Sequence, residues 1–276
     1  MSIRLRDVFA RELGDLRYEP IEKRIRGILG GEPVVDSSRA VLVWEPGRIV
    51  PSYAIPLADV DGTVTASAVR APTDASEIDA PALGDRRVLT PAVPFSVHTT
   101  EGSPLTIRPR DGESEAVAFR PADKALSEYA ILDFEAFDAW YEEDERNIGH
   151  PRDPFHRIEI VHSSRDVRVE VDGDVVAESS EPYLLFEPPL PVRYYLPRED
   201  VRTDVLVPSA KTTVCAYKGQ ASYWSLEGDD DIVWSYPEPM REAREITGRL
   251  AFFNERVDLV VDGAPLPRPV TPWSPR

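Results

Sequence analysis

The stretch GEPVVDSSRAVLVWEP at residues 31–46 returns 142 residues later as GDVVAESSEPYLLFEP at residues 173–188, with Glu45-Pro46 falling on Glu187-Pro188. Both stretches contain short apolar runs bounded by Gly, Asp and Pro, a pattern that predicts β-strands joined by turns. Similarity at a long interval indicates that a structural unit is repeated. The pair therefore predicts an all-β chain built from two copies of one unit.

Two further blocks repeat in the same order. LTPAVPFSVHTTEG at 89–102 aligns without a gap with LVPSAKTTVCAYKG at 206–219, and FEAFDAWYEED at 134–144 aligns with NERVDLVVDGA at 254–264. The offsets are 117 and 120, so the first copy is expected to hold roughly 24 extra residues. We expect these in the loop-like segment 61–85.

The pattern predicts two tandem small antiparallel two-sheet domains. We expect a short amphipathic N-terminal helix at 1–17, a divergent first β-domain at 18–150, a second β-domain at 151–265, and a Pro-rich tail at 266–276 that is extended or disordered. In the second copy, strands are predicted near 167–171, 174–179, 183–187, 192–196, 211–217, 221–226, 231–236 and 248–260.

Composition narrows the classes of partner. A net charge of −17 and a pI near 4.7 argue against nucleic acid, whose binders carry basic patches. A single cysteine excludes an internal disulfide framework. The N-terminal residues lack the apolar core of a signal peptide, and no apolar run approaches the length that spans a bilayer. We therefore expect a cytoplasmic protein that binds neither nucleic acid nor membrane, of unknown oligomeric state.

The segment VCAYKGQASYWSL at 214–226 holds that cysteine and has the character of a hairpin with Gly219 at its tip. Strand alternation places Thr213, Cys215 and Tyr217 on one face. A patch of Cys215, Tyr217 and Tyr223 with Lys218 at its edge is then geometrically possible. Cys215 is interpreted as a buried core residue, a residue lining a site, or a nucleophile, which needs an activating neighbour.

These residues lead to a hypothesis of ligand binding in the second domain. A small anionic or aromatic ligand would meet a cation and stacked rings, and Lys218→Ala would weaken binding without unfolding the protein. The alternatives are an enzyme that uses Cys215 or Lys218 in transfer or redox chemistry, and a structural or interaction module. The candidate ligand-binding residues are Arg193, Tyr195, Tyr217, Lys218, Tyr223, Trp224, Trp234 and Tyr236.

The first copy differs at this hairpin. The gapless alignment places His98 where the second copy has Cys215, and Glu101 where it has Lys218. Any chemistry of the hairpin is therefore expected in the second copy alone. No Walker loop, Gly-x-Gly-x-x-Gly or Ser/His/Asp order has credible context, so no cofactor is expected.

The segments TTVCAYKGQASYWSL, DIVWSYPEP and AFFNERVDLVVDG resemble the domain-of-unknown-function family 427, a bacterial family. The resemblance covers about residues 157–265 strongly, and residues 18–146 resemble a divergent second example, so the chain resembles the tandem two-copy form. It implies a small antiparallel domain similar to the β-tent, Mss-four-like folds. Zinc-bearing relatives of that group use paired Cys-x-x-Cys motifs, which this chain lacks, so no metal is expected. The family's nucleotidyltransferase label is not followed, because EGSP at 101–104 has no Asp-x-Asp pair downstream.

Overall fold

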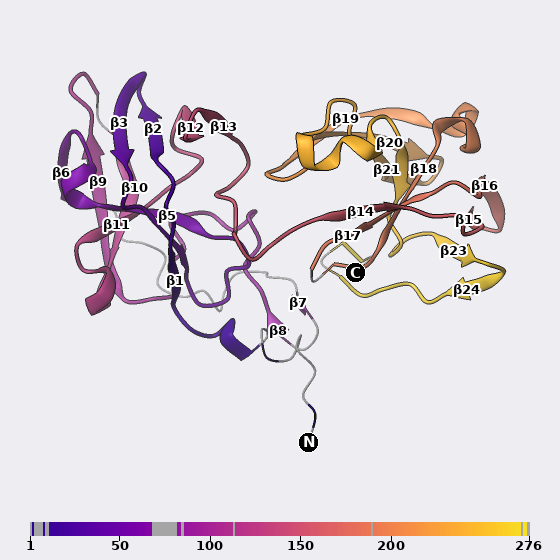
Figure 1. Ribbon diagram of the computed structural model, residues 1–276, viewed down its shortest axis with the longest axis horizontal. Helices are drawn as coiled ribbons and strands as arrows, with labels where there is room; N and C mark the ends of the chain where they lie inside the picture. The colour runs from indigo at the N-terminus through magenta and orange to yellow at the C-terminus, as the bar shows by residue number, and fades with distance from the viewer. Residues whose placement is uncertain are drawn as a thin grey trace. The chain divides into compact units, whose positions relative to one another are not determined.

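The computed structural model describes residues 2, 8, 11–67, 82–83, 86–112, 114–188, 190–271 and 273–274. The chain divides into two compact units, Met1–Asp153 and Pro154–Arg276, called here the first and second domains (Figure 1). Both are built of antiparallel sheets, so the predicted all-β class is confirmed. Most of the predicted N-terminal helix lies outside the described residues, and Val8, Arg11 and Glu12 within it are helical.

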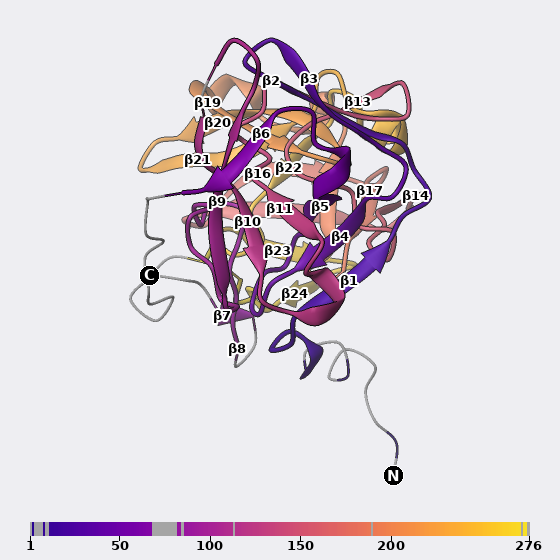
Figure 2. The ribbon, with the colours of Figure 1, turned by 90° about the vertical axis from the view of Figure 1, so that its left-hand side faces the viewer.

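The first domain contains a seven-stranded and a four-stranded sheet. The larger has the order β1-β4-β5-β11-β10-β9-β6, which can be followed across Figure 2, and the smaller has the order β13-β12-β2-β3. The strands are β1 (Arg17–Pro20), β2 (Ile25–Leu29), β3 (Glu32–Ser37), β4 (Val41–Trp44), β5 (Ser52–Pro56), β6 (Thr63–Ala66), β9 (Gly102–Arg108), β10 (Ser114–Pro121), β11 (Tyr129–Leu132), β12 (Ala139–Glu142) and β13 (Glu145–Asn147), with a separate ladder of β7 (Ala82–Leu83) and β8 (Arg86–Arg87).

The second domain repeats this topology strand for strand. Its larger sheet has the order β14-β17-β18-β22-β21-β20-β19 and its smaller sheet β16-β15-β23-β24. The strands are β14 (Glu159–His162), β15 (Val167–Val171), β16 (Asp174–Ser179), β17 (Tyr183–Phe186), β18 (Arg193–Leu196), β19 (Val207–Cys215), β20 (Gly219–Leu226), β21 (Asp229–Ser235), β22 (Leu250–Phe252), β23 (Asp258–Val261) and β24 (Ala264–Leu266). The single strand predicted near 248–260 is wrong, because a turn at 254–256 separates β22 from β23.

Helical structure is confined to short connections. Apart from the N-terminal residues, the described helices are short 3-10 segments: η1 (Leu57–Asp59), η3 (Lys124–Leu126), η4 (Arg198–Asp200), η5 (Thr203–Val205) and η6 (Arg241–Ile246), the last of which is kinked at Ala243. The many prolines suit this arrangement, since proline interrupts helices but is tolerated at strand ends.

Each domain buries two apolar layers. In the second domain, residues such as Val169 on the small sheet and Leu196 and Val233 on the large sheet pack between the sheets. The outer face of the large sheet carries a second cluster rich in aromatic residues, including Tyr195 and Trp234. Burial of each such side chain contributes about 1.5–3 kcal/mol. The alternation of residues along β18 and β21 therefore separates a sandwich core from an aromatic outer face.

The strand pairing corrects one block of the predicted repeat. β11 and β22 correspond with the predicted offset of 120, and the ladders lead from them through β10 and β21 to β9 and β20. On this path Leu105 holds the position of Trp224, an offset of 119 in place of 117. The gapless alignment of 89–102 with 206–219 is therefore wrong in register.

The extra residues of the first domain overlap the predicted segment 61–85 and continue beyond it, up to β9. The strand that pairs with β9 is β6, at the beginning of the segment expected to be a loop, and not residues 89–97. In the second domain the corresponding strand β19 continues directly into a hairpin with β20. The first domain thus carries its added length within this hairpin, between β6 and β9.

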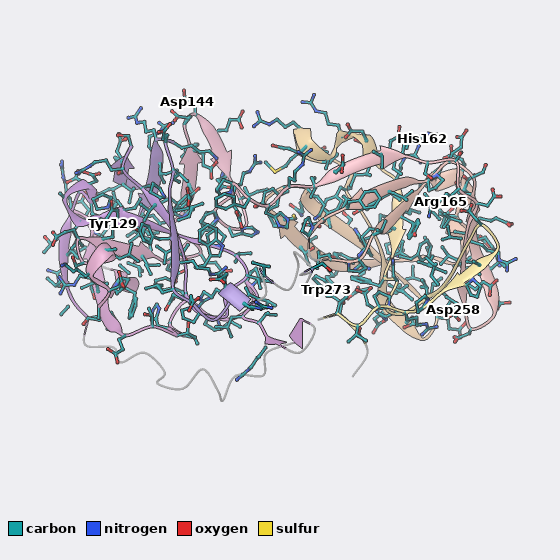
Figure 3. All side chains as sticks on the ribbon, turned by 60° about the horizontal axis from the view of Figure 1, so that its bottom comes forward. Tyr129, Asp144, His162, Arg165, Asp258 and Trp273 are labelled. Atoms are coloured by element: carbon teal, nitrogen blue, oxygen red, sulfur yellow. The ribbon has the colours of Figure 1, made fainter. Side chains whose placement is uncertain are left out.

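The described part of the Pro-rich tail packs on the second domain. The hydroxyl of Thr271 is buried and donates a hydrogen bond to Glu255 at 2.5 Å. Trp273, labelled in Figure 3, lies beside the guanidinium of Arg193. Within the described ranges, no helix has the length and apolar character needed to cross a membrane.

Candidate functional site

The tip of the β19–β20 hairpin is a three-residue turn, residues 216–218, between Cys215 and Gly219. Gly219 has a φ of +97°, and a Cβ there would lie 3.3 Å from the carbonyl oxygen of Glu238. Three-residue hairpin loops often require glycine at such a position. The prediction that Tyr217 continues the strand is wrong, since it lies in this turn and is buried.

Lys218 at the tip is buried against a carboxylate. Its ammonium donates to Oε2 of Glu187, the residue that follows β17, and the two side chains are only 10% and 9% exposed. Nε2 of His156 lies 3.2 Å from the other oxygen, Oε1. The prediction of a cation free to meet a ligand is therefore wrong for Lys218, because the low-polarity interior demands a buried counter-charge.

Lys218 and Glu187 each shift the pKa of the other. Burial alone would raise the pKa of Glu187, but the Lys218 ammonium and the hydrogen bonds from His156 and Lys218 lower it to about 2. Burial alone would lower the pKa of Lys218, but the charge of Glu187 outweighs burial and raises it. Lys218 is thus held as an ammonium, and its amine is not a nucleophile at neutral pH.

Aromatic side chains surround the hairpin tip. The ring of His156 lies 4.8 Å from that of Tyr217, centroid to centroid. The hydroxyl of Tyr195 accepts a hydrogen bond from Nε1 of Trp234 at 2.9 Å. The hydroxyl of Tyr223 is 2.8 Å from Oγ1 of Thr213, at the exposed edge of the sheet.

Tyr236 is the unsatisfied member of this group. The residue is 6% exposed, and its hydroxyl makes no hydrogen bond within the described part of the chain. Burial raises its pKa well above the ordinary value, and the neighbouring Tyr195, Cys215, Tyr223 and Glu187 raise it further. These neighbours place the hydroxyl among the other polar groups of the hairpin. A nearly buried polar group without a partner is uncommon in folded proteins.

Among the residues around the hairpin tip, Cys215 is half-buried. It is a free thiol at the end of β19 and acts electrostatically on both Lys218 and Tyr236. Of the three interpretations of this cysteine, a fully buried core position does not fit its partial exposure. We define the hairpin site as Cys215, Lys218, Glu187, Tyr195 and Tyr236.

Two predicted residues, Arg193 and Trp224, are engaged with other partners. The guanidinium of Arg193 makes two hydrogen bonds of 2.7 Å to Glu255, so it has no free charge for a ligand. It is also enclosed by Trp273 and by Trp234, which keeps it 5% exposed. Trp224 packs with the core between the sheets, on the opposite face of β20 from Tyr223. Of the eight candidate ligand-binding residues, Arg193 is thus bound to Glu255 and Trp224 packs in the core between the sheets.

Sequence reasoning missed Glu187, although the repeated Glu-Pro pair marked it. Its counterpart Glu45 is also buried, with Nδ1 of His98 at 3.0 Å, the backbone N–H of Thr99 at 3.1 Å and Nε of Arg48 at 3.7 Å. Both domains thus supply a histidine and a cation to this glutamate, from positions that do not correspond. The two carboxylates therefore share a structural role: Glu45 anchors the segment before β9, and Glu187 anchors the segment before β20.

Two surface hollows are lined by residues away from the hairpin tip. One is on the small sheet of the second domain, and the other is on the first domain. In the part of the chain that the structure describes, no three His, Cys, Asp or Glu residues are grouped as a metal site would need.

Comparison with known families finds a match within the second domain. Residues 159–263 match a family described as a domain of unknown function, DUF427. The matched region contains four of the residues around the hairpin tip, Glu187, Cys215, Lys218 and Tyr236, while His156 precedes it. No curated protein matches the chain.

Proposed function

We propose that the second domain, whose residues 159–263 match DUF427, binds a small ligand with an anionic or aromatic group at the hairpin site. The observation that carries this proposal is the hydroxyl of Tyr236, which makes no hydrogen bond within the described residues, reaches the surface although the residue is largely buried, and lies near Cys215, Tyr195 and Glu187. An acceptor group on a ligand would give this hydroxyl the hydrogen-bond partner that the described residues do not supply.

The remaining hydrogen-bonding capacity of the site favours a ligand with acceptor oxygens. Glu187 already accepts from Lys218 and His156, and the oxygen of Tyr195 already accepts from Trp234. The free donors are therefore phenol O–H groups and the thiol of Cys215. A carboxylate or carbonyl oxygen fits these donors, and the flanking rings suit an aromatic body.

A thermal-shift screen of the full chain tests this proposal. The panel would contain benzoate, 4-hydroxybenzoate, phenylacetate and acetate, each also scored for protection of Cys215 against iodoacetamide. We expect at least one aromatic carboxylate to raise the Tm of the wild type and of a Tyr141→Phe control in the first domain. Tyr236→Phe should abolish this response. An equal response in Tyr236→Phe, or none in any protein, would reject the proposal.

A second candidate is thiol chemistry, supported by the half-buried Cys215 beside the Lys218 ammonium. The thiolate is the nucleophilic form of a cysteine. In such a transfer reaction Cys215 would attack, and Lys218 would stabilise charge and not form a covalent bond. Alkylation of the single thiol across a pH series, followed by intact mass, decides this. Rapid modification well below pH 8.5, the ordinary range of a thiol, supports it, and modification only in denaturant rejects it.

The first domain is, on this proposal, a divergent tandem copy of the same family, a reading supported by its identical strand order. A cytoplasmic location is part of the same proposal and rests on the acidic composition and the single cysteine. Detection of the chain in a soluble cell fraction, or in a secreted fraction, would decide the location.

A further inference from the structure

The Pro-rich tail contacts a guanidinium that three aromatic rings enclose. The guanidinium carbon of Arg193 lies 5.5 Å from the ring centroid of Trp234 and 5.8 Å from those of Phe253 and Trp273. Trp234 and Phe253 also contact each other, with their ring centroids 4.6 Å apart. Trp273, labelled in Figure 3, is the ring that the tail supplies. Arg193, Trp234, Phe253 and Glu255 are called here the guanidinium subsite.

The tail is attached to this subsite by a hydroxyl and a ring. The hydroxyl of Thr271 donates to Oε1 of Glu255 at 2.5 Å, and the indole of Trp273 lies on Arg193. That indole is 45% exposed, so nearly half of its surface remains in water. In the described chain, the other hydrogen bonds of Thr271, Trp273 and Ser274 stay within the tail. The tail is therefore a locally folded segment held in the way that a short peptide ligand is held.

The first domain forms the same sheet without this guanidinium. Val43 and Leu185 correspond in the repeat at the offset of 142, and they pair with Ser52 and Arg193, respectively. Ser52 thus holds the position of Arg193, and the strand order does not depend on an arginine there. Arginine and tryptophan are instead the residue types that are enriched where proteins recognise partners.

The chemistry of the subsite matches the two groups that the tail supplies. Both oxygens of Glu255 accept from Arg193, and Oε1 accepts in addition from Thr271. A carboxylate has lone pairs for such a further donor. The planar guanidinium presents a face on which an aromatic ring stacks favourably. A hydroxyl donor and, two residues later, an aromatic ring are therefore the features that this subsite selects.

We propose that the guanidinium subsite recognises a short peptide segment in which Thr or Ser is followed two residues later by Trp, and that the tail occupies it as an intramolecular ligand. A segment of a partner protein with this chemistry competes with the tail. A tethered ligand acts at an effective concentration in the millimolar range, so the tail excludes weak competitors. Trp234 also donates to Tyr195, so a bound segment lies next to the hairpin site.

Fluorescence anisotropy of the full chain with a labelled tail peptide tests the proposal. The peptide is Pro-Arg-Pro-Val-Thr-Pro-Trp-Ser-Pro-Arg, the sequence of residues 267–276. The double variant Thr271→Val with Trp273→Ala vacates the subsite in the full chain and leaves the subsite residues unchanged. We expect saturable binding to this variant. For a Kd of about 100 µM, the tethered tail of the wild type should weaken binding about tenfold.

Two altered peptides test which groups are recognised. A peptide with Val for Thr and Ala for Trp has the same charge and should bind the vacated variant at least tenfold more weakly. A peptide with Ser for Thr should retain most of the affinity, because serine keeps the hydroxyl that donates to Glu255.

No saturable binding of the tail peptide to the vacated variant up to millimolar concentration would overturn the proposal. So would equal affinity for the variant and the wild type, or equal affinity of the Val and Ala peptide, which would assign binding to charge alone. If the double variant fails to fold, Trp273→Ala alone, which removes a half-exposed ring, takes its place with the same refuting outcomes. The measurement needs no ligand at the hairpin site, so its failure is distinct from a failure of the Tyr236→Phe test.

Discussion

Replacement of Lys218 with methionine should destabilise the second domain severely. Lys218 and Glu187 are each about one-tenth exposed, so the variant leaves a carboxylate buried without its cation. Removing one partner of such a pair costs about 3–5 kcal/mol. A second argument gives a similar value: the pKa of Glu187 falls from 4.5 to about 2, which corresponds to about 3 kcal/mol.

The single cysteine allows this loss to be measured in one domain of the intact chain. Cys215 lies in the second domain, so its labelling during a urea series reports the unfolding of that domain. With urea slopes of about 1–3 kcal/mol per molar, Lys218→Met should lower the midpoint by roughly 1–3 M. Lys211→Met is the matched control, because Lys211 is 44% exposed and its pair with Asp231 contributes less than about 1 kcal/mol.

The double variant Lys218→Met with Glu187→Gln distinguishes the effect of an unpaired buried charge on stability from the effect of lost side-chain packing. Because the buried charge is removed together with its partner, the double variant should be more stable than the sum of the single changes implies. The reasoning fails if Lys218→Met lowers the midpoint no more than Lys211→Met does. It also fails if the single changes are additive. A large loss of stability would also contradict the expectation from the sequence that Lys218→Ala leaves the protein folded.

Three further outcomes follow from the second domain. The contribution of Glu187 is complete above pH 4.5 and is lost as the pH falls toward 2, so labelling midpoints should drop in that window and remain flatter in Glu187→Gln. Arg193→Ala should cost about 3–5 kcal/mol by the same assay, whereas Arg268→Ala, which breaks an exposed pair, should change little. Tyr236→Phe should change the free energy of unfolding by less than about 1 kcal/mol, because its hydroxyl makes no hydrogen bond in the described structure. A larger loss would show that the hydroxyl has a structural partner.

Strand prediction worked where local pattern and tertiary environment agree. The strands expected at 167–171 and 174–179 are β15 and β16, and Asp172 and Gly173 between them adopt the positive φ that a tight turn requires. It failed at 248–260, where an apolar run is divided by a turn. Apolar content alone does not distinguish one long strand from two short ones that pair in different sheets.

The site was harder to predict than the strands. Alternation placed Cys215 and Tyr223 on one face, and both act electrostatically on Tyr236, but Lys218 was expected at an exposed edge and is 8% exposed. Its partner Glu187 is 31 residues away, and no local pattern links the two. The same holds for Arg193 and Glu255, which are 62 residues apart. Burial and pairing of charges are properties of the packed chain, and only the pairing reveals which cations are free for a ligand.

The amino-acid sequence by itself determined that the protein is all-β, that two similar units follow one another, and that one hairpin with a single thiol is its most distinctive segment. These features reside in turn residues, alternation and repeated motifs, which act over a few neighbouring residues. Only the tertiary structure decided the register of the repeat, the pairing of Lys218 with Glu187, and the position of the Tyr236 hydroxyl, which has no partner among the residues that the structure describes. Each of these depends on which distant strands become neighbours, because hydrogen bonds and ion pairs form between side chains that the fold, and not the chain order, brings together.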